Sequence, residues 1–264
     1  MEASRDRIKG SLAAGLRILE AVALAKKPPK LTEIATLIDR PKSSTHRLLA
    51  ALCTAGFLKR EEKTRAYMLT TKMWSLGVSV FAEYDLPKIA RPHLEDFMVK
   101  TNEASHLAVL EGVRNVVFID RVRSGQLIAV NSFAGDRFPA FSSASGRAIL
   151  AFQGDAIVDA ALAPPLTSST PRTVTEPSSL KTILESVRRD GVAVVKGETY
   201  EERAGVAAPI RDHTGHVIAA CGVAVPVFRL NDALIEILIA TAKEAARRIS
   251  HDLGYDGACA PRKP

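Results

Sequence analysis

The sequence predicts an α+β protein in which an N-terminal winged helix-turn-helix is followed by a linker helix and a C-terminal domain with an antiparallel sheet. The length of 264 residues suggests two domains rather than one. The net excess of positive charge is confined to the first quarter, and the apolar spacing changes from helical to strand-like near residue 104. We therefore place the winged domain at residues 1–72, the linker helix at 73–86, the C-terminal domain at 87–254 and a tail at 255–264.

The net charge of +7 is unevenly divided along the chain. Residues 1–75 carry 15 Lys and Arg against 7 Asp and Glu, whereas residues 76–264 carry 21 against 22. A basic segment joined to a neutral one is typical of a nucleic-acid-binding module attached to a second domain. A basic surface that is merely solvated is the alternative, and charge alone does not separate the two.

The composition narrows the class of protein further. The three cysteines are an odd number, and none lies close to another, so neither a disulfide framework nor a CxxC metal site is available. The N-terminus lacks the apolar segment of a secretory signal, and no apolar stretch is long enough to span a bilayer. We expect a cytoplasmic protein with no membrane contact, no metal and no cofactor.

Three helices are predicted in the first quarter. The first, at residues 11–25, is capped by the polar Ser11, and the second, at residues 32–38, is capped by Thr32. The third, at residues 42–52, ends before Gly56. The apolar side chains that we expect to face the core of the first and third helices are Leu12, Leu16, Leu19, Val22, Leu48, Leu49 and Leu52.

The third helix begins with polar residues, and a basic hairpin at residues 57–69 follows it. In a helix-turn-helix the start of the second helix enters the major groove, and a basic hairpin after it is a wing. The expected DNA-contacting residues are Lys42, Ser43, Ser44, Thr45, His46 and Arg47 on the helix, and Lys59, Arg60, Lys63 and Arg65 on the hairpin. A small helical bundle explains the serines as caps but leaves the hairpin's charge unexplained. An adaptor for acidic proteins is a further alternative.

The C-terminal domain is predicted from the change of apolar period. A helix at residues 71–84 leads into it, and a second helix starts at Pro87. The expected strands are residues 105–110, 115–120, 127–133, 192–196, 205–210 and 217–225. The expected helices are residues 146–152, 155–162, 179–190 and 234–253. Helices packed on an antiparallel sheet result.

We find no motif of a hydrolase, a nucleotide-binding enzyme or a metalloprotease in this domain, so we expect no enzyme. A serine cluster at residues 142–147 lies just before a predicted helix. It either caps the helix or presents backbone N–H groups to a carboxylate. A small-molecule enzyme that uses these serines is the alternative, and it needs a base such as His106 within hydrogen-bond reach of Ser143 or Ser145.

Several segments together carry a family resemblance. They are LRIL at residues 16–19, PKSSTHRLL at 41–49, GFL at 56–58, ARPHL at 90–94, HLAV at 106–109, IDR at 119–121, GRA at 146–148 and AAP at 207–209. In this order they resemble the IclR family of bacterial transcriptional regulators over residues 10–254. The resemblance implies a winged helix that binds a palindromic operator as a homodimer. It also implies a GAF-like domain that senses a small organic acid, often with two dimers pairing into a tetramer.

The resemblance also implies where an effector binds. The carboxylate of a small keto acid meets backbone N–H groups that match Ala144 and Ser145, before a Gly-Lys pair whose Lys is replaced here by Arg147. Polar residues common in such pockets match glycine or alanine in this chain. The expected effector-binding residues are His106, Phe133, Ala144, Ser145, Gly146, Gly205, Gly222 and Ala224. The lost polar groups suggest a larger, less polar effector such as an aromatic or longer-chain acid, and loss of sensing is the alternative.

Overall fold

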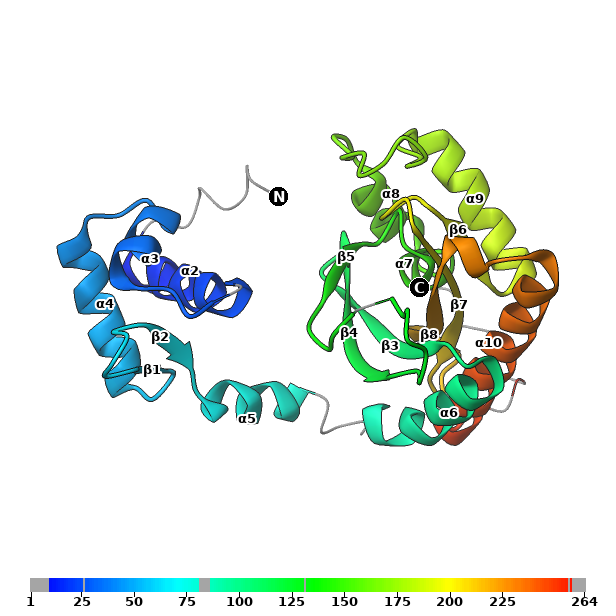
Figure 1. Ribbon diagram of the computed structural model, residues 1–264. Helices are drawn as coiled ribbons and strands as arrows, with labels where there is room; N and C mark the ends of the chain where they lie inside the picture. The colour runs from blue at the N-terminus through cyan, green and yellow to red at the C-terminus, as the bar shows by residue number, and fades with distance from the viewer. Residues whose placement is uncertain (1–9, 26, 81–85, 131, 256, 258–264) are drawn as a thin grey trace. The chain divides into compact units, whose positions relative to one another are not determined.

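The computed structural model describes residues 10–25, 27–80, 86–130, 132–255 and 257 (Figure 1). The chain divides into two compact units, Met1–Tyr84 and Asp85–Pro264. The expected tail at residues 255–264 and the last four residues of the expected helix at 71–84 fall almost wholly outside the described residues. None of the described helices combines the length and the apolar content needed to cross a bilayer.

The first unit is a small helical domain with a hairpin. Its elements are α2 (Ser11–Leu24), α3 (Leu31–Leu37), α4 (Lys42–Thr54), the antiparallel strands β1 (Leu58–Arg60) and β2 (Tyr67–Leu69), and α5 (Thr71–Val80). One apolar cluster joins the helices to the hairpin, and Ile18, Ile34, Leu49 and Leu58 are its most buried members. The order of helices and hairpin is that of a winged helix-turn-helix.

Two details of the first two helices were predicted wrongly. Helix α2 turns Ala13, Ala14, Ile18 and Val22 inward and leaves Leu12 and Leu16 exposed. Residues 12–14 are all apolar, so the spacing fits two helix faces, and the small alanines permit the closer packing. The caps also differ: the N-cap of α2 is Gly10, one residue before the expected Ser11, and that of α3 is Lys30, two residues before the expected Thr32.

The second unit is built on one antiparallel sheet. The strands lie in the order β5-β4-β3-β8-β7-β6, so segments from both halves of the unit meet at its centre. Their bounds are β3 (Ala104–Glu111), β4 (Asn115–Val122), β5 (Arg137–Pro139), β6 (Ala193–Lys196), β7 (Arg203–Arg211) and β8 (Val217–Pro226). Strands β3 and β8 pair directly although more than a hundred residues separate them in the sequence.

Helices cover both faces of this sheet (Figure 1). Helices α6 (Leu86–Thr101) and α10 (Asp232–Asp252) pack on one face, where Phe97, Val206 and Cys221 are fully buried. Helices α7 (Ala144–Leu150), α8 (Asp155–Leu162) and α9 (Pro177–Asp190) share the second core, with Ala207 and Ala220 of the sheet. A short 3-10 helix, η1 (Val227–Arg229), connects β8 to α10. The α+β class is confirmed.

The described residues of the strand predicted at 127–133, which are 127–130, 132 and 133, form no strand, and the third strand of this region is β5. The guanidinium of Arg121 donates to the carbonyl oxygens of Val130, at 2.9 Å, and of Ser132. Those carbonyls are therefore engaged by a side chain instead of a neighbouring strand. Leu127 and Ile128 are exposed, so the apolar pattern that suggested a strand does not mark a buried face.

Candidate nucleic-acid interface and ligand pocket

The start of α4 presents a polar surface. Lys42, Ser43, His46 and Arg47 are exposed, as the sequence predicted. Thr45 is wholly buried, and its hydroxyl donates to the carbonyl oxygen of Pro41 at 3.1 Å, so we remove it from the DNA-contacting set. The helical period predicts the burial of Thr45, because Thr45 precedes the core residue Leu49 by four positions and shares its face of the helix. Ser44 is half-buried, and its hydroxyl also donates to Pro41, at 2.9 Å.

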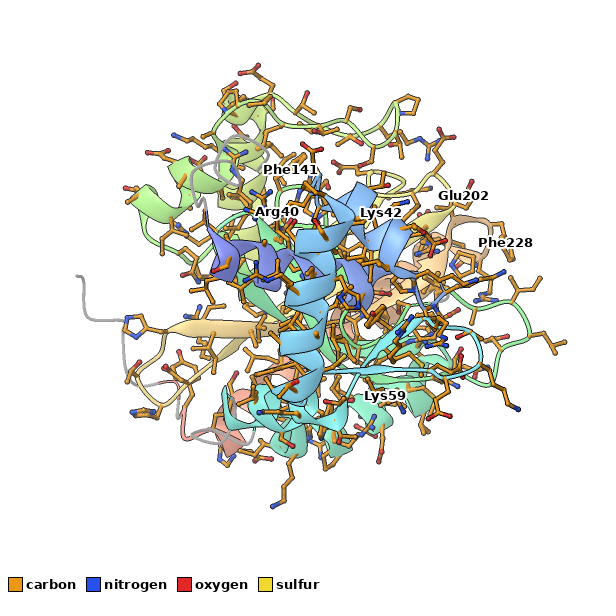
Figure 2. All side chains as sticks on the ribbon, turned by 90° about the vertical axis from the view of Figure 1, so that its left-hand side faces the viewer. Arg40, Lys42, Lys59, Phe141, Glu202 and Phe228 are labelled. Atoms are coloured by element: carbon orange, nitrogen blue, oxygen red, sulfur yellow. The ribbon has the colours of Figure 1, made fainter. Side chains whose placement is uncertain are left out.

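The hairpin after α4 carries the second group of cations. Lys59, Arg60, Lys63 and Arg65 are all exposed. The backbone of Glu61 closes the turn, because its N–H donates to Ala66 at 2.8 Å and its carbonyl accepts from Arg65 at 2.9 Å. Figure 2 shows this side of the first unit, with Lys42 at the start of α4 and Lys59 on the hairpin beyond its end. The two groups therefore belong to one basic unit of helix and wing.

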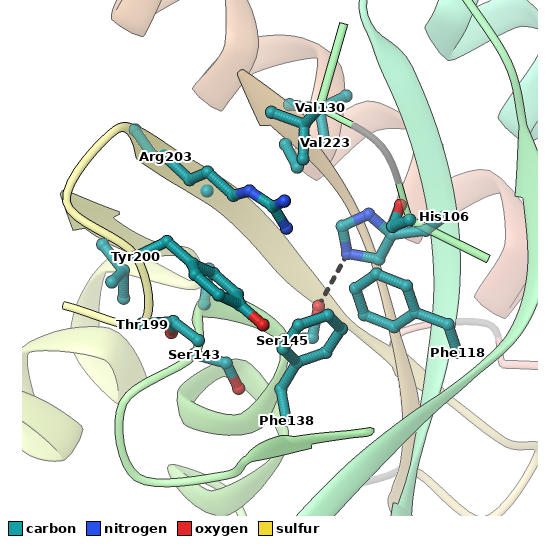
Figure 3. A pocket seen from close by; sticks show the side chains of 16 residues that line it. His106, Phe118, Val130, Phe138, Ser143, Ser145, Thr199, Tyr200, Arg203 and Val223 are labelled. Atoms are coloured by element: carbon teal, nitrogen blue, oxygen red, sulfur yellow. Dashed lines mark hydrogen bonds between the residues drawn. The ribbon is translucent and has the colours of Figure 1, made fainter. Parts of the chain in front are cut away.

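The second unit contains a pocket at the start of α7 (Figure 3). Its cavity volume is about 70 Å³. Side chains of Phe118 from β4, Phe138 from β5 and Tyr200 from the loop before β7 form aromatic walls. Strands β6, β7 and β8 supply small and aliphatic residues, namely Val195, Ala204, Gly205, Val223 and Ala224. The lining is therefore mostly apolar, with a few polar groups, as in most small-molecule sites.

The start of α7 is held at this pocket by the serine cluster and a glycine. The hydroxyl of Ser143 accepts the N–H of Gly146 at 3.2 Å and so caps the helix. A Cβ at Gly146 would lie 2.1 Å from the carbonyl oxygen of Ala140. Only glycine therefore allows α7 to approach the preceding backbone this closely.

His106 is one of the buried polar residues of the pocket. Its Nε2 lies 2.8 Å from the hydroxyl of Ser145, and its ring stacks on Phe118 at 4.0 Å between centroids. Burial, with a smaller effect of the nearby Arg121 cation, lowers the pKa of His106 from 6.5 to about 3. The imidazole is therefore neutral at physiological pH.

This burial predicts a pH dependence of stability. The pKa of His106 in the folded protein, about 3, lies below the unfolded value of 6.5, so protonation favours the unfolded chain. Stability is full above pH 6.5 and falls by roughly 1.4 kcal/mol per pH unit as the pH drops toward 3. Urea unfolding at pH 7.5 and 5.0 should show the wild type losing about 2 kcal/mol more than His106→Gln. Equal losses in both proteins would contradict the neutral buried imidazole.

A buried ion pair joins α7 to the loop that carries Tyr200. The two terminal guanidinium nitrogens of Arg147 donate to the carboxylate of Glu198, at 2.7 and 2.6 Å, and its Nε donates to the carbonyl of Phe141 at 2.7 Å. The Glu198 carboxylate also accepts the N–H of Val174 at 3.2 Å. The paired charges fix the start of the loop that lines the pocket.

The structure brings most but not all of the expected pocket residues together. His106, Ala144, Ser145, Gly205 and Ala224 line the cavity. The other three expected residues, Phe133, Gly146 and Gly222, do not. Phe133 is 50% exposed in the segment that forms no strand.

Gly222 is a glycine because of strand packing. A Cβ there would lie 2.5 Å from the carbonyl oxygen of Val206. The absent side chain at Gly222 therefore leaves no space for a ligand. Gly205, Gly222 and Ala224 are the positions that match polar residues of other family pockets, and of these only Gly205 and Ala224 line the cavity. Sequence analysis missed Phe118, Phe138, Tyr200 and Arg203, because their convergence depends on strand order and on the course of a loop.

The arrangement favours binding over catalysis. His106 and Ser145 are within the distance that the enzyme alternative required. An imidazole with a pKa of about 3 is a weak base at neutral pH, and among the described residues no carboxylate is hydrogen-bonded to its ring. The described residues also contain no cluster of His, Cys, Asp and Glu that could hold a metal ion.

A basic winged helix-turn-helix joined to a domain with a mostly apolar pocket defines a ligand-responsive DNA-binding regulator. The sequence profile described as IclR helix-turn-helix domain matches residues 11–62, and that described as bacterial transcriptional regulator IclR C-terminal matches residues 78–251. The chain belongs to the IclR family of bacterial transcriptional regulators. Its relatives are named as regulators, so the enzyme alternative is set aside.

Individual relatives are similar over most of the chain. HTH-type transcriptional regulator KdgR of Escherichia coli is 29% identical over 85% of this chain and 86% of its own length. The Pca regulon regulatory protein of Pseudomonas putida is 29% identical over 90% of this chain and 84% of its own. An IclR homolog from Microbacterium hydrocarbonoxydans, crystallised with 4-hydroxybenzoate, has a TM-score of 0.80 at 29% identity, covering 92% of this chain and 99% of that one.

Proposed function

We propose that this regulator is a cytoplasmic homodimer, with two dimers forming a tetramer, that binds an inverted-repeat operator and responds to a small organic acid. The exposed polar start of α4, followed by the basic hairpin, is the observation that carries the DNA-binding assignment. Arg47 is suited to reading guanine O6 and N7, and the wing cations are suited to the phosphates.

The aromatic walls of the pocket support an aromatic or longer-chain acid as the effector. Phe118, Phe138 and Tyr200 offer ring surfaces, and Gly205 keeps one wall free of a side chain. The structural relative from Microbacterium hydrocarbonoxydans was crystallised with 4-hydroxybenzoate, which supports the same ligand class. We retain Ala144 and Ser145, at the start of α7, as candidates for binding the carboxylate through their N–H groups.

The size of the cavity adds a condition to this proposal. An engineered protein cavity of about 150 Å³ holds benzene, whereas the cavity here is about 70 Å³. An aromatic acid therefore requires the pocket to widen. Tyr200 is 45% exposed and has solvent to move into, so its displacement is the expected response to the ligand. Such a movement links binding to a conformational change, which is what a regulator needs.

Substitutions on α4 and on the wing test the DNA-binding assignment. Arg47→Ala should weaken operator binding by about 1–3 kcal/mol and relax base preference at one operator position. Lys63→Ala should weaken binding to all sequences to a similar extent and reduce its salt dependence. Competition binding with operator and unrelated DNA at two salt concentrations measures both. Unchanged operator affinity in Arg47→Ala would show that α4 is not the recognition helix as we place it.

A further inference from the structure

Arg203 directs a guanidinium group into the pocket (Figure 3). It is the first residue of β7, and its backbone is fixed on both sides: its carbonyl accepts from Gly197 at 2.8 Å and its N–H donates to Tyr200 at 3.1 Å. Its Cζ lies 4.2 Å from the centroid of the Tyr200 ring. The side chain is half-buried, and we find no carboxylate paired with it among the described residues.

Arg203 is the cation that faces the cavity, because the other basic residues nearby are neutral, paired or outside the lining. His106, the other basic residue of the lining, is neutral at physiological pH because burial lowers its pKa to about 3. Arg121 does not line the cavity, and the two terminal nitrogens of its guanidinium donate to the carbonyl oxygens of Val130 and Ser132. Arg147 is neutralised by Glu198. Within the described residues that line the pocket, Arg203 therefore supplies the one side-chain charge.

A guanidinium against apolar walls is suited to a particular kind of ligand. Contact with the Tyr200 ring offsets part of the cost of removing Arg203 from water, but it leaves the N–H donors available. A carboxylate satisfies a guanidinium through two parallel hydrogen bonds, and this pairing is stronger away from water. A neutral amide of the same shape provides one acceptor and no charge.

We propose that Arg203 binds the carboxylate of the effector and makes the pocket selective for monoanionic acids over their neutral amides. This inference rests on the proposed function, because it assigns a residue and a charge to the same pocket. The apolar body of the acid then lies among Phe118, Phe138 and Tyr200. The N–H groups at Ala144 and Ser145 are the competing position for the carboxylate, and the experiment separates the two.

Paired acids and amides are the probes for this test. The full chain is titrated by calorimetry with benzoate, 4-hydroxybenzoate, phenylacetate, hexanoate and pyruvate, each beside its primary amide. The variants are Arg203→Gln and Arg203→Lys, with Arg211→Gln as the matched control. Arg211 lies on the same strand, is half-buried and also contacts an aromatic ring, that of Phe152 at 4.6 Å, but it does not line the cavity.

We expect the wild type to bind its preferred acid at least tenfold more tightly than the amide. In Arg203→Gln this ratio should fall toward one through loss of acid affinity, Arg203→Lys should keep part of it, and Arg211→Gln should keep all of it. An unchanged ratio in Arg203→Gln would overturn the inference in favour of the α7 amides. Equal weakening of acid and amide would also overturn it, because only shape would then be affected. Failure of the wild type to bind any acid would instead contradict the proposed function.

Discussion

Replacing Gly146 by alanine is expected to destabilise the second unit by at least ~3 kcal/mol and to abolish effector binding. The added Cβ would lie 2.1 Å from the carbonyl oxygen and 2.3 Å from the Cα of Ala140. Both are backbone atoms, so no side chain can turn away, and α7 must shift from the pocket that it borders. Scanning calorimetry of the full chain, with the transition of the second unit resolved, measures the effect.

Gly125→Ala is the control for that substitution. Gly125 is exposed in the same unit, and a Cβ there would meet no atom within 4 Å. Its stability should stay within about 0.5 kcal/mol of the wild type. If Gly146→Ala were as stable as this control, the close contact between α7 and Ala140 would be contradicted.

The buried pair of Arg147 and Glu198 should give the second large effect. The side chains of Arg147 and Glu198 are only 3% and 11% exposed, so Arg147→Met or Glu198→Gln leaves one charge buried without its partner. The expected loss is about 3–5 kcal/mol for each single substitution. In Glu198→Gln the loop that carries Tyr200 should also loosen, and acid binding should weaken with it.

A double-mutant cycle separates this coupling from general damage. Combining Arg147→Met with Glu198→Gln removes both charges, so the double variant should be more stable than the sum of the two single losses predicts. The exposed pair of Lys181 and Asp159, 2.8 Å apart, is the comparison and should couple by less than about 1 kcal/mol. Additive losses at Arg147 and Glu198 would show that the bridge does not stabilise the pocket.

Local patterns predicted the winged unit well because its signals are local. Polar residues at the start of α4, a glycine after it and a basic turn each lie within a few residues of the structure they specify. The error in the buried face of α2 has a different origin. Three successive apolar residues, 12–14, fit two helix faces, and only the neighbouring helices decide which face is buried.

The pocket was predictable only in part. The start of α7 was found from its serines and glycine, and this prediction does not depend on the rest of the fold. Arg203 and Tyr200 carry no local signal, because their position depends on the pairing of β7 with its neighbours and on the loop fixed by Glu198. At Gly222 the sequence was misleading for a similar reason. The missing side chain lets the strand backbones pack closely and does not make room for a ligand.

Selection from a random-sequence DNA pool tests the central claim most directly. The full chain is used at two salt concentrations, because binding to phosphates weakens steeply with salt while base preference persists. We predict enrichment of an inverted repeat at both concentrations, as a dimer with two recognition helices requires. Recovery of DNA without any enriched motif at either concentration would contradict sequence-specific regulation by this protein.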